Sequence, residues 1–325
     1  MIEEILPQLY KIEIPLPNNP LKALNSYLIK GQDRFLIIDT GMDREECKQE
    51  MFTALKKLGV DLKRTDFFIT HVHADHLGLI SALATDSSTV YFNEQEPSIV
   101  AAERFEKRWL GISETHRTHG FPEAEAEKAM QNHPGRKYGL KNHVDFHILK
   151  EDDIVEIADY SFRCIETPGH SPGHMCLYEP TKKILVSGDH ILSKITPNIT
   201  VWPEMDNSLK HYLASLEKIY PLDVNLVLPG HRNIWNNHRK RIAELQEHHK
   251  NRLNEILSVL EEGGKTTWEI APYISWDINY SSWELFPPAQ KMFAFGETLA
   301  HLIYLEGNKT IQSTTKEQRI VFSLD

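Results

Sequence analysis

The sequence has little cysteine, no long apolar run and no excess of positive charge. Its three cysteines, Cys47, Cys164 and Cys176, lack zinc-knuckle spacing, which indicates reduced thiols and a cytoplasmic protein. No run approaches the ~20 apolar residues of a membrane span, so we expect no membrane partner. The first residues lack a basic stretch followed by an apolar core, and we predict no secretory signal. The formal net charge of −10 disfavours nucleic acid, because phosphate binding needs clustered Lys and Arg.

Histidine, by contrast, is abundant, with 17 residues. Several metal-binding side chains follow the apolar run at residues 67–69 within one short stretch: His71, His73, Asp75 and His76. Imidazole and carboxylate together suit zinc, iron or manganese. The alternative is a His-rich surface loop that binds nothing.

Three more candidate ligands occur in one repeated setting, in which a strand is followed by a tight turn and then by the ligand. His170, Asp189 and His231 each come directly after a glycine. Glycine allows the backbone dihedral angles that a sharp turn needs. Together with the first motif, these residues supply seven ligands, enough for two metal ions.

The order H-x-H-x-D-H, then His170, Asp189 and His231, resembles the metallo-β-lactamase superfamily of hydrolases. The resemblance implies an α/β fold of the αββα sandwich type and two divalent ions, with zinc favoured over iron or manganese. It assigns one ion to His71, His73 and His170, the other to Asp75, His76 and His231, and the bridging position to Asp189.

The same resemblance implies a hydroxide shared by the two ions as the attacking group. Asp75 is expected to orient this hydroxide or to carry its proton to the leaving group. Asp39, at an earlier strand end, is expected to be the hydrogen-bond partner of a ligand histidine.

Departures from particular subfamilies narrow the expected reaction. True metallo-β-lactamases carry Cys or Ser where this chain has Asp189, which disfavours lactam hydrolysis. Lactonases of the superfamily place a Tyr three residues further on, where this chain has Leu192. Flavodiiron proteins carry Glu where this chain has His73. We therefore expect an ester, a thioester or a similar bond of a small molecule as the substrate.

The hydrophobic pattern predicts a catalytic domain at residues 1–262 and a second domain at residues 263–325. Strands and helices alternate through the first domain, and Asp43 is expected to cap a helix at residues 44–58, with Glu46 completing the cap. Residues 93–145 are interpreted as a helical insertion, either a lid or oligomer contact or a solvated decoration, with a looser segment at 133–139. A long linking helix is predicted at residues 238–261.

The last third resembles hydrolases with a C-terminal winged-helix-like domain, a group that includes an endoribonuclease. Residues 264–325 contain five Lys and Arg against seven Asp and Glu, which favours a structural or homodimer-forming cap over a reader of nucleic acid. His248 and Arg252 lie one helical turn apart and either reach a substrate anion or form a solvated basic face.

Two other functions stay open at this point. The first is an endoribonuclease or phosphodiesterase of the same superfamily. The second is a nucleic-acid-binding or regulatory protein whose metal site is only structural.

Overall fold

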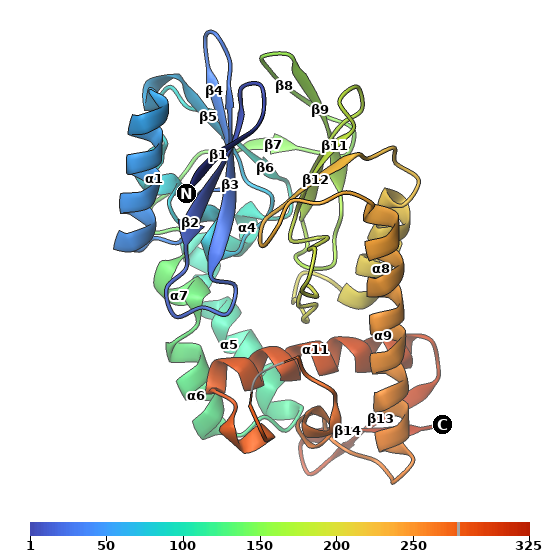
Figure 1. Cartoon of the computed structure of the whole chain (residues 1–325). Helices are drawn as coiled ribbons and strands as arrows, with labels where there is room; N and C mark the ends of the chain where they lie inside the picture. Colours follow the sequence, from blue (N-terminus) through green and yellow to red (C-terminus); the bar gives the residue numbers. More distant parts are fainter. Residues whose placement is uncertain (278–279) are drawn as a thin grey trace.

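Two β-sheets packed face to face form the larger part of the molecule (Figure 1). The computed structural model describes residues 1–277 and 280–325, with the backbone alone for residues 102–106. The first sheet has its strands in sequence order: β1 (Ile2–Leu6), β2 (Leu9–Pro15), β3 (Ala23–Lys30), β4 (Phe35–Ile38), β5 (Thr65–Phe68), β6 (Val90–Asn93) and β7 (His147–Leu149). The second sheet has the order β12 (Leu226–Pro229), β11 (Ile184–Gly188), β10 (Met175–Glu179), β9 (Tyr160–Glu166) and β8 (Ile154–Ile157).

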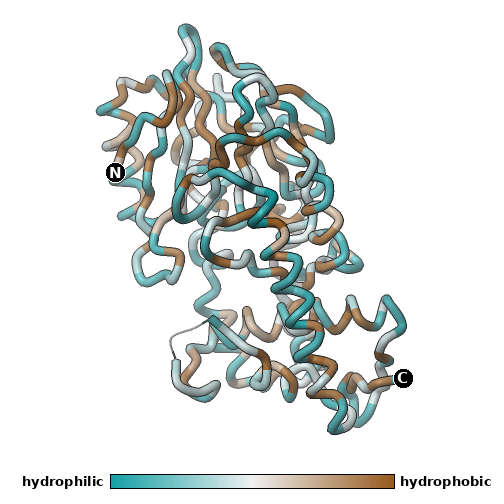
Figure 2. The backbone as a smooth tube through the Cα atoms, turned by 45° about the vertical axis from the view of Figure 1, so that its right-hand side comes forward, coloured by the Kyte–Doolittle hydropathy of each residue, from teal (hydrophilic) through white to brown (hydrophobic). Residues whose placement is uncertain are grey.

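Apolar side chains on the facing sides of the two sheets hold the sandwich together. Tyr27 and Phe68 of the first sheet share one buried cluster with Phe162 and Leu177 of the second. Figure 2 shows many hydrophobic residues along these strands. Burying such side chains stabilises each by roughly 1.5–3 kcal/mol relative to exposure.

Helices cover both outer faces of the sandwich. On the first sheet lie α1 (Glu45–Leu58), the 3₁₀ turn η1 (Leu62–Arg64), and the short helices α2 (Ala74–Leu77) and α3 (Ile80–Leu83). On the second lie α8 (Ser208–Ile219) and the first half of α9 (His238–Leu260), whose Leu245 packs in one cluster with Leu216 and Leu185. This order of layers confirms the predicted α/β sandwich.

Strand direction brings the predicted ligands to one edge of the sandwich. Strands β4, β5, β6 and β7 run parallel, as do β11 and β12. β9 runs the same way as β11, because both are antiparallel to β10. The loops that follow β4, β5, β9, β11 and β12 therefore leave from the same edge.

The insertion and the C-terminal region lie beyond that edge and pack on each other (Figure 1). The insertion contains α4 (Pro97–Val100), α5 (Ala102–Thr118), α6 (Glu123–Gln131) and α7 (Pro134–Tyr138). The C-terminal region contains α10 (Thr267–Ile270), η2 (Ala271–Tyr273), η3 (Trp283–Leu285), α11 (Pro288–Gly307) and the hairpin of β13 (Ile311–Lys316) and β14 (Arg319–Leu324).

One hydrophobic cluster joins these two regions across their distance in the sequence. Phe121 and Met130 of the insertion pack in it with Phe295 and Leu299 of α11 and with Phe322 of β14. The insertion is thus a packed element and not a solvated decoration. Its part as a lid or an oligomer contact stays a prediction, as does the winged-helix-like nature of residues 263–325.

Two local features differ from the expectations. Asp43 does not cap α1, because its carboxylate pairs with Lys48 at 2.5 Å and Lys141 at 2.6 Å, and the helix starts after Arg44 without a side-chain cap. Residues 134–138 form α7 where a looser segment is predicted. Strand β1 pairs with β2 at the edge of the first sheet.

Among the described residues, no helix combines the length and the apolar character needed to cross a membrane.

Candidate metal centre

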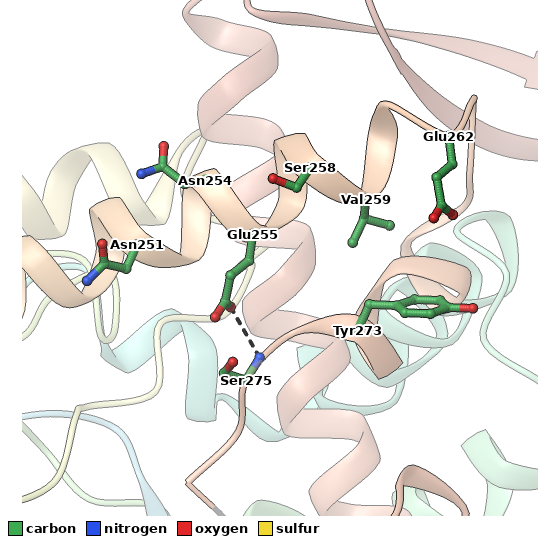
Figure 3. Close-up of a pocket in the computed structure, with 8 residues that line it drawn as sticks. All are labelled: Asn251, Asn254, Glu255, Ser258, Val259, Glu262, Tyr273 and Ser275. Atoms are coloured by element: carbon green, nitrogen blue, oxygen red, sulfur yellow. Dashed lines mark hydrogen bonds between the residues drawn. The ribbon is translucent and has the colours of Figure 1, made fainter.

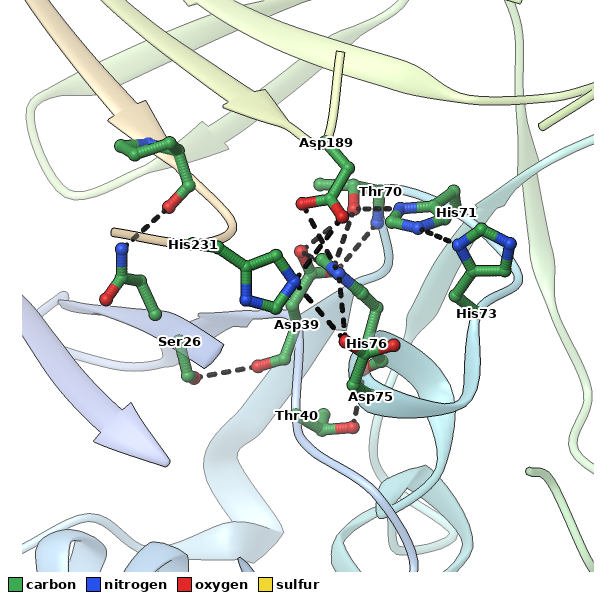
Figure 4. Close-up of polar contacts among 12 residues, drawn as sticks. Ser26, Asp39, Thr40, Thr70, His71, His73, Asp75, His76, Asp189 and His231 are labelled. Carbon is green, nitrogen blue, oxygen red and sulfur yellow. Dashed lines mark hydrogen bonds and ion pairs between the residues drawn. The ribbon is translucent and has the colours of Figure 1, made fainter. Parts of the chain in front are cut away.

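The seven predicted ligands lie together where the strand-end loops meet. Figure 4 labels all of them except His170. Their nitrogen and oxygen atoms form three overlapping groups, each within 4.8 Å: His71 with His73 and His170, His71 with His76 and Asp189, and Asp75 with His76 and His231. The first and third groups match the two predicted ligand sets, and Asp189 lies between them.

Three imidazoles converge in the first group. Nδ1 of His73 lies 3.0 Å from Nε2 of His71 and 2.9 Å from Nε2 of His170. Zinc–nitrogen bonds of about 2.0–2.1 Å in a tetrahedral site separate the ligand atoms by roughly 3.3 Å. The spacing of the three nitrogen atoms is therefore close to that of three ligands on one ion.

The second group combines imidazole and carboxylate. Oδ2 of Asp75 lies 3.3 Å from Nε2 of His231 and 4.0 Å from Nε2 of His76. Asp189 faces both groups, with one oxygen 3.6 Å from Nε2 of His76 and the other 3.8 Å from Nε2 of His170. Its place between the groups is the one predicted for a bridging carboxylate.

Residues outside the ligand set accept hydrogen bonds from four of the histidines and so orient their rings. Nδ1 of His231 donates to the Ala23 carbonyl at 2.7 Å, and Nδ1 of His170 donates to the Asn198 carbonyl at 2.9 Å. A carbonyl oxygen only accepts, so Nδ1 carries a proton and Nε2 is the ring nitrogen that faces the centre. Metal-binding histidines are commonly oriented in this way.

His76 and His71 are oriented through Asp39. Nδ1 of His76 lies 2.7 Å from Oδ2 of Asp39, which also accepts from the Thr70 hydroxyl at 2.8 Å. The oxygen of that hydroxyl lies 3.0 Å from Nδ1 of His71 and accepts a hydrogen bond from it. The predicted partnership of Asp39 with a ligand histidine is present, and the histidine is His76.

The centre has the charge balance of a cation site. Asp39, Asp75 and Asp189 are buried, and among the described residues none pairs with Lys or Arg. Burial alone would lower the pKa of His231, but Asp189 and Asp75 raise it to about 10. Burial alone would raise the pKa of Asp75, but His76 and His231 lower it to about 2. Protons on these histidines neutralise the carboxylates, as metal ions would.

Three buried polar atoms without hydrogen-bond partners also indicate a cation site. Nε2 of His76, Nε2 of His231 and Oδ1 of Asp189 are buried and make no hydrogen bond to any described residue. A buried polar group without a partner costs about 1–3 kcal/mol. Because all three atoms face the same point, the residues present fit divalent ions.

The glycines beside the ligands act in two ways. Gly169 and Gly188 have φ of 140° and 47°, which favour glycine, as predicted for the turns before His170 and Asp189. Gly230 is needed for space instead, because a Cβ there would collide with Oδ1 of Asp189 and lie 2.8 Å from Cε1 of His76.

Two supporting residues are not predicted from the sequence. The buried carboxylate of Glu96, after β6, accepts from the Ser171 hydroxyl at 2.7 Å and the Gly173 amide at 2.6 Å, which holds the loop that carries His170. Burial raises the pKa of Glu96 to about 7. Trp202 stacks on His73 with ring centroids 5.7 Å apart. Neither residue belongs to a local motif that marks its role.

Arg252 and His248 do not join the seven ligands. Arg252 is buried in an ion pair with Glu297 and donates to the Ser275 carbonyl at 2.8 Å. The His248 ring packs against that of His249, 5.2 Å away. Arg252 does not lie on a solvated face, since its side chain is 6% exposed and its charge is paired with Glu297. Contact of His248 or Arg252 with a substrate anion stays a prediction.

The chain belongs to the metallo-β-lactamase superfamily, whose family model matches residues 21–231. It is a member of a superfamily of metallo-hydrolases. It is 24% identical over 308 residues to the probable metallo-hydrolase YqjP of Bacillus subtilis, covering 91% of this chain and 92% of the relative. It is 26% identical over 225 residues to the human acyl-coenzyme A thioesterase MBLAC2, covering 65% of this chain and 74% of the relative.

A solved structure extends the likeness to nearly the whole chain. The crystal structure of a metallo-β-lactamase family protein from Thermus thermophilus matches with a TM-score of 0.80 at 28% identity. The match covers 99% of this chain and 100% of that one. The insertion and the C-terminal region therefore occur together in another member of the superfamily.

Proposed function

We propose that this protein is a binuclear metal-dependent hydrolase that cleaves thioesters of small molecules, with acyl-coenzyme A thioesters as the first substrates to test. The observation that carries the proposal is the convergence of two ligand groups with Asp189 between them, together with three buried ligand atoms, on His76, His231 and Asp189, that make no hydrogen bond to any described residue. The likeness to an acyl-coenzyme A thioesterase supports the choice of bond.

In this proposal, His71, His73 and His170 would hold one ion, Asp75, His76 and His231 would hold the other, and Asp189 lies between the two groups. Zinc suits this imidazole-rich set, and iron or manganese are the alternatives. When bound, two divalent ions lower the pKa of bound water to about 7 and polarise the carbonyl under attack.

Asp75 has the position and the charge to direct the attacking water. Burial would raise the pKa of Asp75, but the neighbouring His76 and His231 lower it to about 2. Asp75 is therefore ionised at neutral pH and accepts a hydrogen bond. In thioester hydrolysis a carbon–oxygen bond forms, the carbon–sulfur bond breaks, and a proton of the water goes to the sulfur. We assign the orientation of that water and the passage of its proton to Asp75.

The test measures metal content and thiol release together. The full chain is purified without added metal, its zinc, iron and manganese are determined, and each metal form is offered short- and long-chain acyl-coenzyme A, an aryl ester and single-stranded RNA. We expect two ions per chain and thiol release that Asp189→Ala abolishes. Asp206→Ala is the matched control, because Asp206 is an exposed carboxylate that pairs with His211 at 2.8 Å.

Three outcomes contradict the proposal. Cleavage of RNA without thiol release favours an endoribonuclease. Aryl ester hydrolysis without thiol release moves the substrate to oxygen esters. Metal binding without turnover of any of the substrates favours a structural site in a regulatory protein.

A further inference from the structure

The loop at residues 190–207, between β11 and α8, packs against the metal ligand His170. The Asn198 carbonyl accepts a hydrogen bond from Nδ1 of His170 at 2.9 Å. From the same loop, Nε1 of Trp202 donates to the His170 carbonyl at 3.1 Å. The orientation of the His170 ring therefore depends on where this loop places Asn198.

The side chain of Asn198 is held by the C-terminal region and not by the sandwich. Its Nδ2 donates to Oε2 of Glu297 on α11 at 2.9 Å, and lies 3.4 Å from the Phe293 carbonyl. Asn198 thus connects the two sides of the molecule, with its backbone on His170 and its side chain on α11.

Glu297 is itself fixed by Arg252 of α9. Their side chains are 7% and 6% exposed and form a direct ion pair. Arg252 also lies 4.3 Å over the Trp276 ring and donates to the Ser275 carbonyl at 2.8 Å. Ser275 is held in turn by α9, where its amide donates to Glu255 at 3.1 Å, at the edge of a hollow of about 640 Å³ (Figure 3).

We propose that Glu297 is a positioning residue for the metal ligand His170, acting through Asn198, so that α9 and α11 complete the metal centre from outside the sandwich. This inference rests on the proposed function only in requiring that His170 binds a metal ion. It gives the C-terminal region a part in metal binding that its fold alone does not indicate.

Burying an ion pair is expensive, and apolar residues of similar volume often stabilise a fold equally well. The pair holds Oε2 of Glu297 at one position, and that oxygen anchors Asn198. Partners of ligating histidines typically change metal affinity about 10- to 100-fold when they are removed.

The experiment compares three variants of the full chain. Asn198→Ala keeps the carbonyl that contacts His170 but removes its anchor to Glu297. Arg252→Met with Glu297→Leu removes the ion pair without leaving a buried charge unpaired. The triple variant combines them. Glu125→Gln is the matched control, because Glu125 pairs with Lys291 of the same helix α11 at 3.2 Å, outside the centre.

The readouts are the zinc dissociation constant, from competition with a chelator, and the visible absorption spectrum of the cobalt-substituted protein. Thermal unfolding of each variant reports whether it is folded. We expect the first two variants to weaken zinc binding about 10- to 100-fold and to alter the cobalt spectrum. The triple variant should bind zinc no more weakly than the weaker-binding of the two variants that it combines, because both changes act through the Asn198 carbonyl. The control should match the wild type within about twofold.

Two results overturn the inference alone: zinc affinity of Asn198→Ala within about twofold of the wild type, or fully additive losses in the triple variant. A wild-type chain that binds no metal overturns the proposed centre and this inference together. A wild-type chain that binds two ions but cleaves no thioester overturns the proposed substrate alone. The zinc affinities of the variants then still decide whether Glu297 positions His170.

Discussion

Oδ2 of Asp39 lies 2.7 Å from Nδ1 of His76, and both residues are buried (Figure 4). The other oxygen of Asp39 accepts from the Thr70 amide at 2.9 Å. One carboxylate thus serves as acceptor both for a ligand histidine and for the backbone at the start of the motif at residues 70–76. An ionised carboxylate suits this position because it has only acceptor sites.

Asp39→Asn should therefore weaken metal binding about 10- to 100-fold, because the amide NH₂ group faces a hydrogen-bond donor and leaves His76 or Thr70 without an acceptor. Equilibrium dialysis against buffered zinc measures the change. Asp66→Asn is the control, since Asp66 pairs with Arg34 at 2.5 Å on the same sheet. It should lower stability and leave zinc affinity unchanged. Equal zinc affinity in both variants would show that Asp39 does not orient His76.

Gly230→Ala should reduce activity and metal content far more than it reduces folding. The new Cβ would collide with Oδ1 of Asp189 and would displace that carboxylate from between the ligand groups. Gly111→Ala is the matched control, because a Cβ there meets nothing within 4 Å, and a helical position favours alanine over glycine by roughly 0.5–1 kcal/mol. Metal analysis and thiol release on both variants check this. Full activity in Gly230→Ala would mean that Asp189 has room to move without consequence.

The convergence of the seven candidate ligands was predictable because each belongs to a short local pattern. The motif at residues 71–76 and the glycines before His170, Asp189 and His231 are visible within a few positions of the chain. The parallel direction of neighbouring strands then brings these loop ends together. Local pattern and sheet topology agree here, which is what a single well-defined site requires.

What could not be predicted depends on partners far away in the sequence. The sequence around Arg252 does not indicate which group its charge pairs with. In the fold, Glu297 of α11, 45 residues further along the chain, pairs with it. Asp43 has the pattern of a helix cap, but Lys141 of the insertion competes for its carboxylate. The role of Glu96 rests on a loop 75 residues later. Such contacts depend on the packing of whole elements, and local periodicity does not encode them.

Removing the metal should destabilise the chain by a measurable amount. Ions that bind only the folded state stabilise it by about 4 kcal/mol at a free concentration one thousand times the dissociation constant. A chain of this size should therefore lose roughly six degrees of Tm for each ion that the chelator removes, and regain them with zinc. Differential scanning calorimetry checks this. His231→Ala, which removes one ligand, should respond less. Identical Tm values with and without chelator would contradict a metal centre in the folded protein.

The stability of the shared core of the insertion and α11 should fall in mild acid through His116. Its ring is 4% exposed and lies 5.2 Å from the rings of both Phe121 and Phe295. Burial, with smaller effects of His133 and His119, lowers the pKa of His116 from 6.5 to about 4. Between these values the unfolded chain binds a proton that the folded chain does not, so stability is complete above pH 6.5 and is lost as the pH falls toward 4.

His116→Phe keeps a planar ring and removes this titration. The slope of unfolding free energy against pH, from urea titrations of the metal-free chain between about pH 4 and 6.5, should decrease by up to about 1.4 kcal/mol per pH unit. Other buried histidines keep part of the slope, with burial lowering the pKa of His133 to about 4 and of His301 to about 3. His143→Phe, at a histidine whose side chain is 87% exposed, should keep the wild-type slope. An unchanged slope in His116→Phe would mean that His116 is protonated in the folded chain at no cost, and that the core around Phe121 and Phe295 admits water.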